Sequence, residues 1–319
     1  IIHNDVVVVN EPSIVALDRN NPKNILAVGK KALMMHEKTH ESIRTVRPLK
    51  DGVIADFKAA ELMNREMIKK IDPKKPLFPP SWRMMICIPS SITEVEKRAV
   101  RDSAEQAGAK EVYLLHEPMA AALGIGIDVE EPVGNMIIDI GGGTTGITVI
   151  ALAGIVCDQS IRIAGDEFTA DIMEALRRYH SLLIGERTAE QIKIQIGAAM
   201  KDIDNPPEDM PVNGRDLVTG IPKQIMVSYQ EIAEALDKSI FKIEEGILKA
   251  LETTPPELAS DIYRRGLYLT GGGALLRGLD KRLAAKIKLP VHIADDPLKS
   301  VVRGTGLALK HYDRYPFVM

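Results

Sequence analysis

Three consecutive glycines between two apolar runs are the first candidate for chemistry in this 319-residue sequence. Gly141 to Gly143 follow an apolar run that ends near Asp139, and Thr144 and Thr145 lead into a second apolar run. Glycine has no Cβ atom to keep the backbone away from a polyanion, and a turn can direct several N–H donors at one point. The carboxylate of Asp139 offers a hard oxygen to Mg²⁺ or its waters. The pattern predicts a β-hairpin whose tip binds phosphate.

The alternative is a tight glycine-rich turn without a ligand. A simple hairpin turn needs only one or two glycines, and an aspartate between an apolar strand and a turn is costly without a partner. Both points favour phosphate. A P-loop is excluded because no Lys-Ser or Lys-Thr pair follows the glycines and no helical pattern begins there.

A second glycine run, Gly271 to Gly273, also follows an apolar strand and precedes Ala274. A helix is expected after it, so backbone N–H groups and the positive end of the helix could meet an anion, or a flat base could lie close. One glycine-rich loop is weak support for a ligand. Two of them, about 130 residues apart and each after a buried strand, predict two half-molecules that face one nucleotide.

Charged residues at three further positions have two interpretations each. Glu117 lies between an expected strand and a helix that begins near Pro118, so it either supports the helix N-terminus or orients a water for attack on phosphate. Glu190 and Lys193 are three residues apart on one face of an expected helix. They form either a solvated ion pair or a grip on a ribose hydroxyl and a base edge.

Strands and helices alternate around Glu117. Residues 83–89 and 112–115 read as strands, and the helix between them is expected to begin with a capping box of Ser91 and Glu94. This order implies parallel pairing and an α/β domain.

Further along the chain, a second capping box, Ser228 with Glu231, begins the clearest helix, which keeps helical apolar spacing to Leu251. Residues 168–184 read as another helix, with 182–184 on its apolar face, and 202–216 read as a polar loop.

Composition excludes several classes of protein. The chain is 45% hydrophobic and 27% charged, as in globular proteins, and its net charge of -3 gives no general attraction to nucleic acid. Cys87 and Cys157 are the only cysteines, and no CxxC pair or histidine cluster occurs. A disulfide framework and a zinc site are therefore not supported, and a reducing cytoplasm is expected. No apolar run approaches the roughly 18 residues of a membrane span.

A proline-rich segment, residues 71–82, carries Leu77 and Phe78 beside Lys74 and Lys75. An apolar tip next to basic groups could dip into an anionic membrane surface. By residue type alone, a loop whose aromatic side chains fold back onto the domain is the favoured alternative.

Taken together, the motifs resemble the superfamily of actin, sugar kinases and heat-shock chaperone ATPases, and within it the MreB family of bacterial actins. The segments that carry the resemblance occur in order along nearly the whole chain: 10–13, 47–56, 117–122, 139–145, 161–167, 184–190 and 269–279. The combination is highly specific, although no single segment would be.

The resemblance implies an actin-like, ribonuclease H-like α/β fold of two lobes, each with a core subdomain and a smaller insertion. Lobe I is expected at 1–125 and 304–319 with an insertion at about 21–62, and lobe II at 126–303 with an insertion at about 166–240. Family members begin with a strand and a first phosphate loop of the Asp-Leu-Gly-Thr type, and this chain starts after that point. We expect a molecule without this loop to bind ATP poorly.

By position, the resemblance also implies the cofactors ATP or ADP with Mg²⁺. Gly141, Gly142 and Gly143 would hold the β- and γ-phosphates, and Asp139 would serve hydrated Mg²⁺. Catalysis would fall to Glu117 and Thr144, which position the attacking water. The adenosine would contact Glu190 and Lys193 on one side, and on the other the residues Gly271, Gly272, Gly273 and Ala274.

The implied function is ATPase activity coupled to polymerisation, in filaments that organise cell-wall synthesis and maintain rod shape. The expected partners are other copies of the chain in paired protofilaments, the inner face of the cytoplasmic membrane through Leu77 and Phe78, and membrane proteins of the cell-elongation machinery. The rivals are an actin-fold sugar kinase, a plasmid-partitioning filament ATPase and a chaperone ATPase. The sequence shows no convincing sugar pocket with a catalytic aspartate, no substrate-binding region follows Met319, and segment 117–122 argues against the plasmid filaments.

Overall fold

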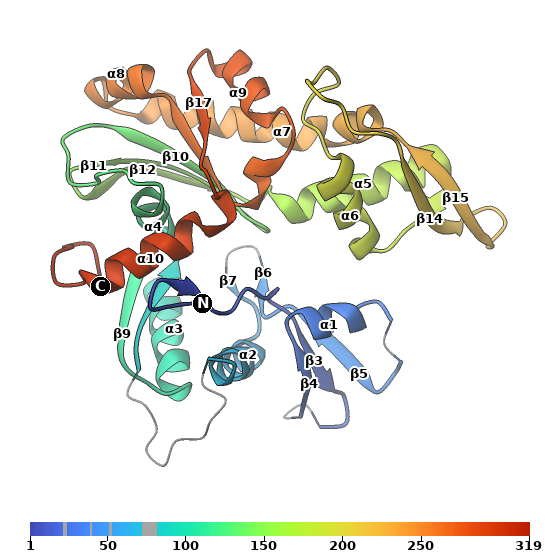
Figure 1. Cartoon of the computed structure of the whole chain (residues 1–319), viewed down its shortest axis with the longest axis horizontal. Coiled ribbons are helices and arrows are strands. Elements are labelled where there is room, and N and C mark those ends of the chain that lie inside the picture. The colour runs from blue at the N-terminus through green and yellow to red at the C-terminus, as the bar shows by residue number, and fades with distance from the viewer. Residues whose placement is uncertain (22–23, 39, 51–52, 72–81) are drawn as a thin grey trace. The chain divides into compact units, whose positions relative to one another are not determined.

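The computed structural model describes residues 1–21, 24–38, 40–50, 53–71 and 82–319 (Figure 1). The chain forms two compact units. The first unit contains Ile1–Ile127 and Val301–Met319, and the second unit contains Asp128–Ser300.

A five-stranded sheet is the centre of the second unit. Its order is β12 (Gly154–Ile161), β11 (Thr145–Ala151), β10 (Asn135–Ile140), β16 (Leu267–Thr270) and β17 (Val291–Ile293). Strands β10, β11 and β12 are antiparallel neighbours, whereas β10, β16 and β17 are parallel. The predicted hairpin is confirmed, with Ile140 paired to Thr145 across the glycine turn.

Three helices complete this core: α7 (Tyr229–Thr253), α8 (Pro256–Arg265) and α9 (Leu279–Ile287). Helix α7 begins with the predicted capping box of Ser228 and Glu231 and packs on β11 and β12 (Figure 1). The apolar side chains at helical spacing along α7 are fully buried, namely Ile232, Leu236, Ile240, Ile243 and Ile247. Burial of this stripe fixes the helix on the sheet.

The second unit also holds α5 (Gly165–His180), α6 (Glu186–Ile196) and a small antiparallel sheet of β13 (Leu182–Leu183), β14 (Met210–Asp216) and β15 (Pro222–Val227). Two predictions are wrong here. Residues 182–184 do not continue a helix, because Ser181 adopts a left-handed conformation (φ 51°) and sends the chain into β13. The second half of the predicted loop 202–216 forms strand β14. Its polar sequence does not indicate a strand, but its backbone pairs with β15.

In the first unit, β8 (Trp82–Ile88) and β9 (Ala109–His116) are parallel, as predicted, and α3 (Glu94–Gln106) connects them. The predicted capping box is misplaced by two residues, because Thr93 and Glu96 form the reciprocal hydrogen bonds. Helix α4 (Glu117–Gly124) follows β9 directly and has proline in its first turn, as expected. Its alanines allow a close approach by α10 (Ser300–Lys310), since a Cβ on Gly304 would lie 1.8 Å from the carbonyl oxygen of Ala120.

The remaining elements of the first unit are a small sheet with two helices and two short strand pairs. The strands β3 (Val15–Asp18), β4 (Ile25–Val28) and β5 (Ile43–Val46) form one sheet, with β3 in the centre, and α1 (Lys30–Met35) and α2 (Phe57–Lys69) pack beside it. Two strand pairs complete the unit: β1 (Ile2–His3) with β2 (Val6–Val7), and β6 (Leu49–Lys50) with β7 (Val53–Ile54).

Candidate functional site

The glycine turn between β10 and β11 caps the N-terminus of α5. The amide of Gly141 donates to the carbonyl oxygen of Thr144 (3.0 Å), which closes the turn. In return, the amides of Gly165 and Asp166 at the start of α5 donate to the carbonyl oxygens of Gly141 (3.1 Å) and Gly142 (2.7 Å). Among the residues that the structure describes, no side chain caps α5, so the backbone of the turn takes that role.

This arrangement determines where the amides of the turn point. In a trans peptide the N–H lies opposite the preceding C=O, so the N–H groups of Gly142 and Gly143 point away from α5. Within the described part of the chain, the amides of Gly142, Gly143 and Thr144 have no hydrogen-bond acceptor. Adjacent N–H donors without internal partners are the donor set that a phosphate requires.

Gly142 has no reason within the protein to be glycine. It does not have a positive φ, it is exposed, and a Cβ placed on it would meet nothing nearer than the carboxyl oxygens of Asp166 at 3.9 Å. Its own fold would accept a side chain at this position. An external group that must approach the backbone closely is the remaining reason for glycine here.

Asp139 lies at the end of β10, beside Thr270 at the end of the parallel strand β16. The hydroxyl of Thr270 donates to Oδ1 of Asp139 (3.1 Å). Burial raises the pKa of the Asp139 carboxyl above its ordinary value of 3.8, and the hydrogen bond from Thr270 opposes this only in part. A buried carboxylate is therefore held where its charge is costly unless a cation lies close.

The second glycine run follows β16 and forms the short 3-10 helix η1 (Gly272–Leu275). Gly271 has a φ of 79°, and a Cβ on it would lie 2.4 Å from the carbonyl oxygen of Ile140 and 2.5 Å from Oδ1 of Asp139. A Cβ on Gly273 would lie 2.2 Å from Cγ2 of Ile140. These glycines are required by close packing against β10.

The two glycine runs therefore do not belong to two half-molecules, and that prediction is wrong. Both lie in the second unit, at the carboxyl ends of the neighbouring strands β10 and β16. Parallel pairing across roughly 130 residues brings them to one edge of one sheet. Carboxyl ends of parallel strands are where α/β proteins commonly bind ligands.

Glu190 and Lys193 form the predicted ion pair (2.6 Å), but Lys193 is not solvated. Its side chain is only 15% exposed, and Nζ donates to the carbonyl oxygen of Gly165 (2.7 Å) and to Oγ1 of Thr169 (3.1 Å). Gly165 is the residue whose amide bonds the glycine turn. The structure thus brings Glu190, Lys193, the first glycine turn and Asp139 to one side of the second unit.

Four residues of this region were not assigned a role from sequence: Gly165, Asp166, Thr169 and Thr270. Asp166 is the most consequential, because its carboxylate lies beside Gly142. The signal for it was the Gly-Asp pair at the junction of strand and helix, since acidic residues favour the first turn of a helix. Thr169 and Thr270 offered no signal in the sequence, because the carboxylates they bond, Glu190 and Asp139, are far away along the chain.

The acidic side chains around the turn test whether Mg²⁺ fits. Asp139 and Asp166 both flank the glycine turn, and among the described residues Lys193 is the cation that contacts α5 beside it. A polyphosphate next to two carboxylates would be repelled without a cation between them. Carboxylate oxygens that leave several positions to water and phosphate suit Mg²⁺. The donor set therefore fits the metal.

Glu117 lies in the first unit, at the junction of β9 and α4, where the sequence predicted it. It is the acidic residue in the first turn of α4, and its neighbours Pro118, Met119 and Ala120 are buried. Leu77 and Phe78 lie outside the described residues. None of the helices that the structure describes is long and apolar enough to cross a membrane.

Comparison with known proteins supports one family. A sequence profile of the MreB/Mbl protein family matches residues 1–316. The cell shape-determining protein Mbl of Bacillus subtilis (strain 168) is 47% identical over 310 residues, which cover 97% of this chain and 92% of Mbl. The cell shape-determining protein MreB of Escherichia coli (strain K12) is 46% identical over 312 residues, covering 97% of this chain and 89% of that protein.

A solved structure supports the same family. The crystal structure of MreB 5 of Spiroplasma citri bound to AMPPNP superposes with a TM-score of 0.90 at 39% identity, and the match covers 98% of this chain and 92% of that one. The actin-like α/β fold that the sequence predicted is confirmed.

Proposed function

This chain belongs to the MreB/Mbl family, and we propose on that premise that it is an actin-like protein that binds and hydrolyses ATP, polymerises into filaments and maintains rod cell shape. The single observation that carries the nucleotide part is the glycine turn at 141–143, whose outward amides lack internal acceptors. Its backbone can bind phosphate without any rearrangement of α5, because the carbonyl groups of the turn already hold that helix.

ATP and ADP are the proposed ligands, with the β- and γ-phosphates on Gly141 to Gly143. Glu190 and Lys193 contact the adenosine, and Gly271 to Ala274 line its other side. Support for this comes from MreB 5 of Spiroplasma citri, which was solved with AMPPNP, and from the contacts that draw Lys193 to the residue beside the turn.

Mg²⁺ is the proposed metal, served by Asp139 through water. When bound, it would neutralise charge on the phosphates and on the buried carboxylate. Thr270 holds Asp139 in place by its hydrogen bond, and Asp166 adds a second carboxylate beside the turn. The raised pKa of Asp139 in the metal-free protein is the expected counterpart of a site built for a cation.

Hydrolysis needs a positioned water rather than a covalent intermediate. Glu117 and Thr144 are the proposed positioning groups: Glu117 accepts a hydrogen bond from the water and directs it, and the hydroxyl of Thr144 orients it near the turn. Glu117 lies in the first turn of α4, and the close approach of Gly304 to Ala120 packs this helix against α10. ATPase activity of this kind serves polymerisation rather than metabolism.

Assembly is proposed to produce paired protofilaments of this chain at the inner face of the cytoplasmic membrane, where they organise membrane proteins of the cell-elongation machinery. Leu77 and Phe78 are the proposed membrane contact. A sedimentation experiment with purified protein, ATP, Mg²⁺ and vesicles containing anionic lipid tests both steps. Polymer that pellets with ATP supports the filament, and the absence of sedimentable polymer across nucleotides and protein concentrations would refute it.

A separate variant tests the proposed membrane contact. Replacing Leu77 and Phe78 by serine is expected to weaken pelleting with vesicles while polymer still forms without lipid, because two apolar side chains no longer enter the interface. Unchanged co-sedimentation would assign the membrane contact to another part of the protein.

The rival functions have less support. The match to cell shape-determining proteins over residues 1–316 favours the cytoskeletal function over a sugar kinase or a plasmid-partitioning filament. ATP turnover that a hexose stimulates would favour the kinase.

A further inference from the structure

Strand β12 is an unusually open edge of the main sheet. It is eight residues long and, among the strands that the structure describes, pairs with β11 alone, whereas the opposite edge strand, β17, has three residues. Long edge strands are normally blunted by proline, lysine or a bulge. The sequence of β12, Gly-Ile-Val-Cys-Asp-Gln-Ser-Ile, contains neither proline nor lysine. Its pairing with β11 has one bulge, at Val156 of β12, and the half of the strand from Cys157 to Ile161 pairs regularly.

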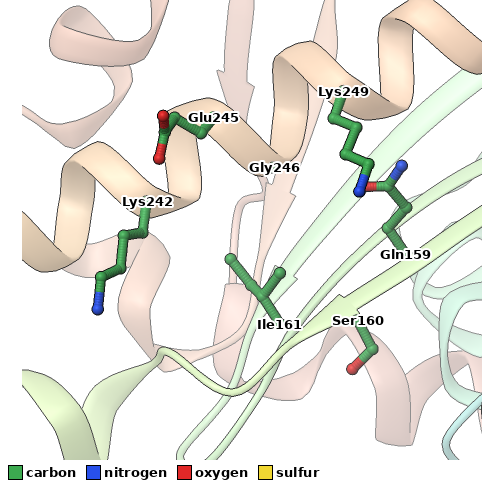
Figure 2. Close-up of a pocket in the computed structure, with 7 residues that line it drawn as sticks. All are labelled: Gln159, Ser160, Ile161, Lys242, Glu245, Gly246 and Lys249. Carbon is green, nitrogen blue, oxygen red and sulfur yellow. The ribbon is translucent and has the colours of Figure 1, made fainter.

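A groove of about 410 Å³ runs beside this edge (Figure 2). Gln159, Ser160 and Ile161 of β12 form one wall, and α7 forms the other with Lys242, Glu245, Gly246 and Lys249. Gly246 lets α7 approach the sheet, since a Cβ there would lie 3.0 Å from Cδ1 of Ile147 and 3.5 Å from Cδ1 of Ile161. The groove therefore has an apolar floor at Ile161.

The charged residues of the groove have a defined order along α7. Lys242 and Lys249 are seven residues apart on α7, and Figure 2 shows Lys249 extending toward Gln159 of β12 and Lys242 extending from α7 at the other end of the groove. Neither ammonium group forms an ion pair with a residue in the described ranges. Glu245 lies between them on the helix. The groove thus offers positive charge at both ends and negative charge in the middle.

We propose that the β12 edge binds an extended, acidic segment of a partner protein, which adds to the sheet as a further strand and places acidic side chains on Lys242 and Lys249. In an antiparallel pair every second residue of β12 directs its N–H and C=O away from β11, so the edge offers main-chain hydrogen bonds to such a segment. Lys242 and Lys249, at the two ends of the groove, favour a segment that carries acidic side chains.

Spacing predicts the pattern of the segment. Seven residues of α7 span about 10.5 Å, and residues i and i+4 of a strand are about 13.5 Å apart on the same face, a difference that two lysine side chains can bridge. The middle residue of that face would meet Ile161 and Glu245, so it should be apolar and not acidic. The expected pattern is acidic, any, apolar, any, acidic.

The test uses the full chain and a fluorescent peptide, Ser-Glu-Thr-Val-Thr-Glu-Ser, measured by anisotropy at low salt. A permuted peptide of the same composition, Ser-Thr-Glu-Val-Glu-Thr-Ser, puts the acids and the valine on opposite faces and is the matched ligand control. The first peptide is expected to bind and the permuted one to bind more weakly. Failure of the first peptide to bind at any concentration tested would overturn the proposal.

Two double variants distinguish binding in the groove from a general effect of net charge. Lys242→Glu with Lys249→Glu is expected to weaken binding at least about tenfold, because two attractive contacts become repulsive. Lys238→Glu with Lys286→Glu makes the same change in net charge on the same unit outside the groove, and should bind as the parent does. Equal affinity of the two double variants would contradict the proposed site.

Hydrogen exchange tests strand addition itself. Bound peptide is expected to slow exchange at alternate amides of β12 and to leave β17 unchanged, since only the outward amides of β12 gain acceptors. Binding without protection in β12 would show an electrostatic contact with the lysines alone and would overturn the strand model. These readouts need no nucleotide, so they are independent of the proposed ATPase function.

Discussion

The two glycine runs of the second unit look alike in sequence but differ in what requires them. A side chain on Gly271 or Gly273 would collide with β10 at 2.2 to 2.5 Å, and Gly271 has a positive φ. A side chain on Gly142 would meet nothing of the protein within 3.8 Å, its nearest neighbours being carboxyl oxygens at 3.9 Å. Gly271 and Gly273 are glycine because of the fold, whereas the fold gives no such reason at Gly142, where the proposed phosphate ligand would supply one.

This difference shows how a binding turn can be recognised. A glycine with a steric or conformational reason within the protein carries little information about ligands. A glycine without such a reason, next to amides that lack acceptors, indicates a group that approaches the backbone from outside. By this criterion Gly142 belongs to the proposed phosphate site, whereas Gly271 and Gly273 are packing positions against β10.

The largest effect is expected from Gly271→Ala. Both the positive φ and the overlap with Ile140 and Asp139 oppose a methyl group at this position. The free energy of unfolding should therefore be about 3 kcal/mol lower than in the parent protein. Urea unfolding followed by circular dichroism measures this. A loss below about 0.5 kcal/mol would show that the second run is not a packing requirement and would remove the contrast between the two runs.

Glu117→Ala sharpens the distinction between binding phosphate and cleaving it. Loss of a water-positioning carboxylate should slow phosphate release about 100-fold, while ATP affinity stays within about threefold because the glycine turn is intact. Single-turnover phosphate release and a binding titration with a fluorescent ATP analogue measure the two quantities. An equal loss in both would refute the positioning role.

Gly142→Ala should have the opposite profile to Gly271→Ala. The fold accepts the methyl group, so stability should change by less than about 1 kcal/mol, but ATP affinity should fall about tenfold because Cβ stands where the phosphate approaches. Gly154→Ala is the matched control, since its Cβ would have ordinary contacts, the nearest at 3.6 Å, and it lies at another turn of the same sheet. Normal ATP affinity in Gly142→Ala would contradict a phosphate site here.

The smallest effect concerns pH and Asp139. Because burial raises the pKa of this carboxyl in the folded protein, the folded state binds the proton more tightly than the unfolded state does. Its contribution to stability is fully present below pH 3.8 and is lost as the pH rises through the folded pKa. In metal-free buffer, Asp139→Asn should therefore gain stability relative to the parent as pH rises above 3.8.

Calorimetric unfolding of the two proteins across that range measures the difference. A pH-independent difference would show that Asp139 is not held where its charge is costly. At neutral pH, addition of MgATP should make the parent more stable than Asp139→Asn, because the variant lacks the carboxylate that the metal favours.

Local features of the site could be predicted from the sequence. The hairpin around residues 139–145 was predictable because an apolar run, a turn and a second apolar run are adjacent in the chain. The capping box at Ser228 and Glu231 was predictable for the same reason. Where the local pattern occurs twice, as Ser91 with Glu94 and Thr93 with Glu96, sequence alone did not select the pair that the structure uses.

Contacts between distant segments could not be predicted. Glycine runs about 130 residues apart look like parts of two lobes until the pairing of β10 with β16 is known. In the same way, Lys193 reads as a surface residue until its contacts with Gly165 and Thr169 on α5 are seen. These pairings are decided by which strands and helices pack together, and the sequence does not encode that locally.

The most direct measurement is a crystal structure of this protein with AMPPNP and Mg²⁺. We expect phosphate oxygens within about 3.2 Å of the amide nitrogens of Gly142, Gly143 and Thr144, with α5 still capped by the carbonyl groups of the turn. Phosphates bound elsewhere, with those three amides left in solvent or turned to acceptors of the protein, would contradict the assignment of this turn as the phosphate site.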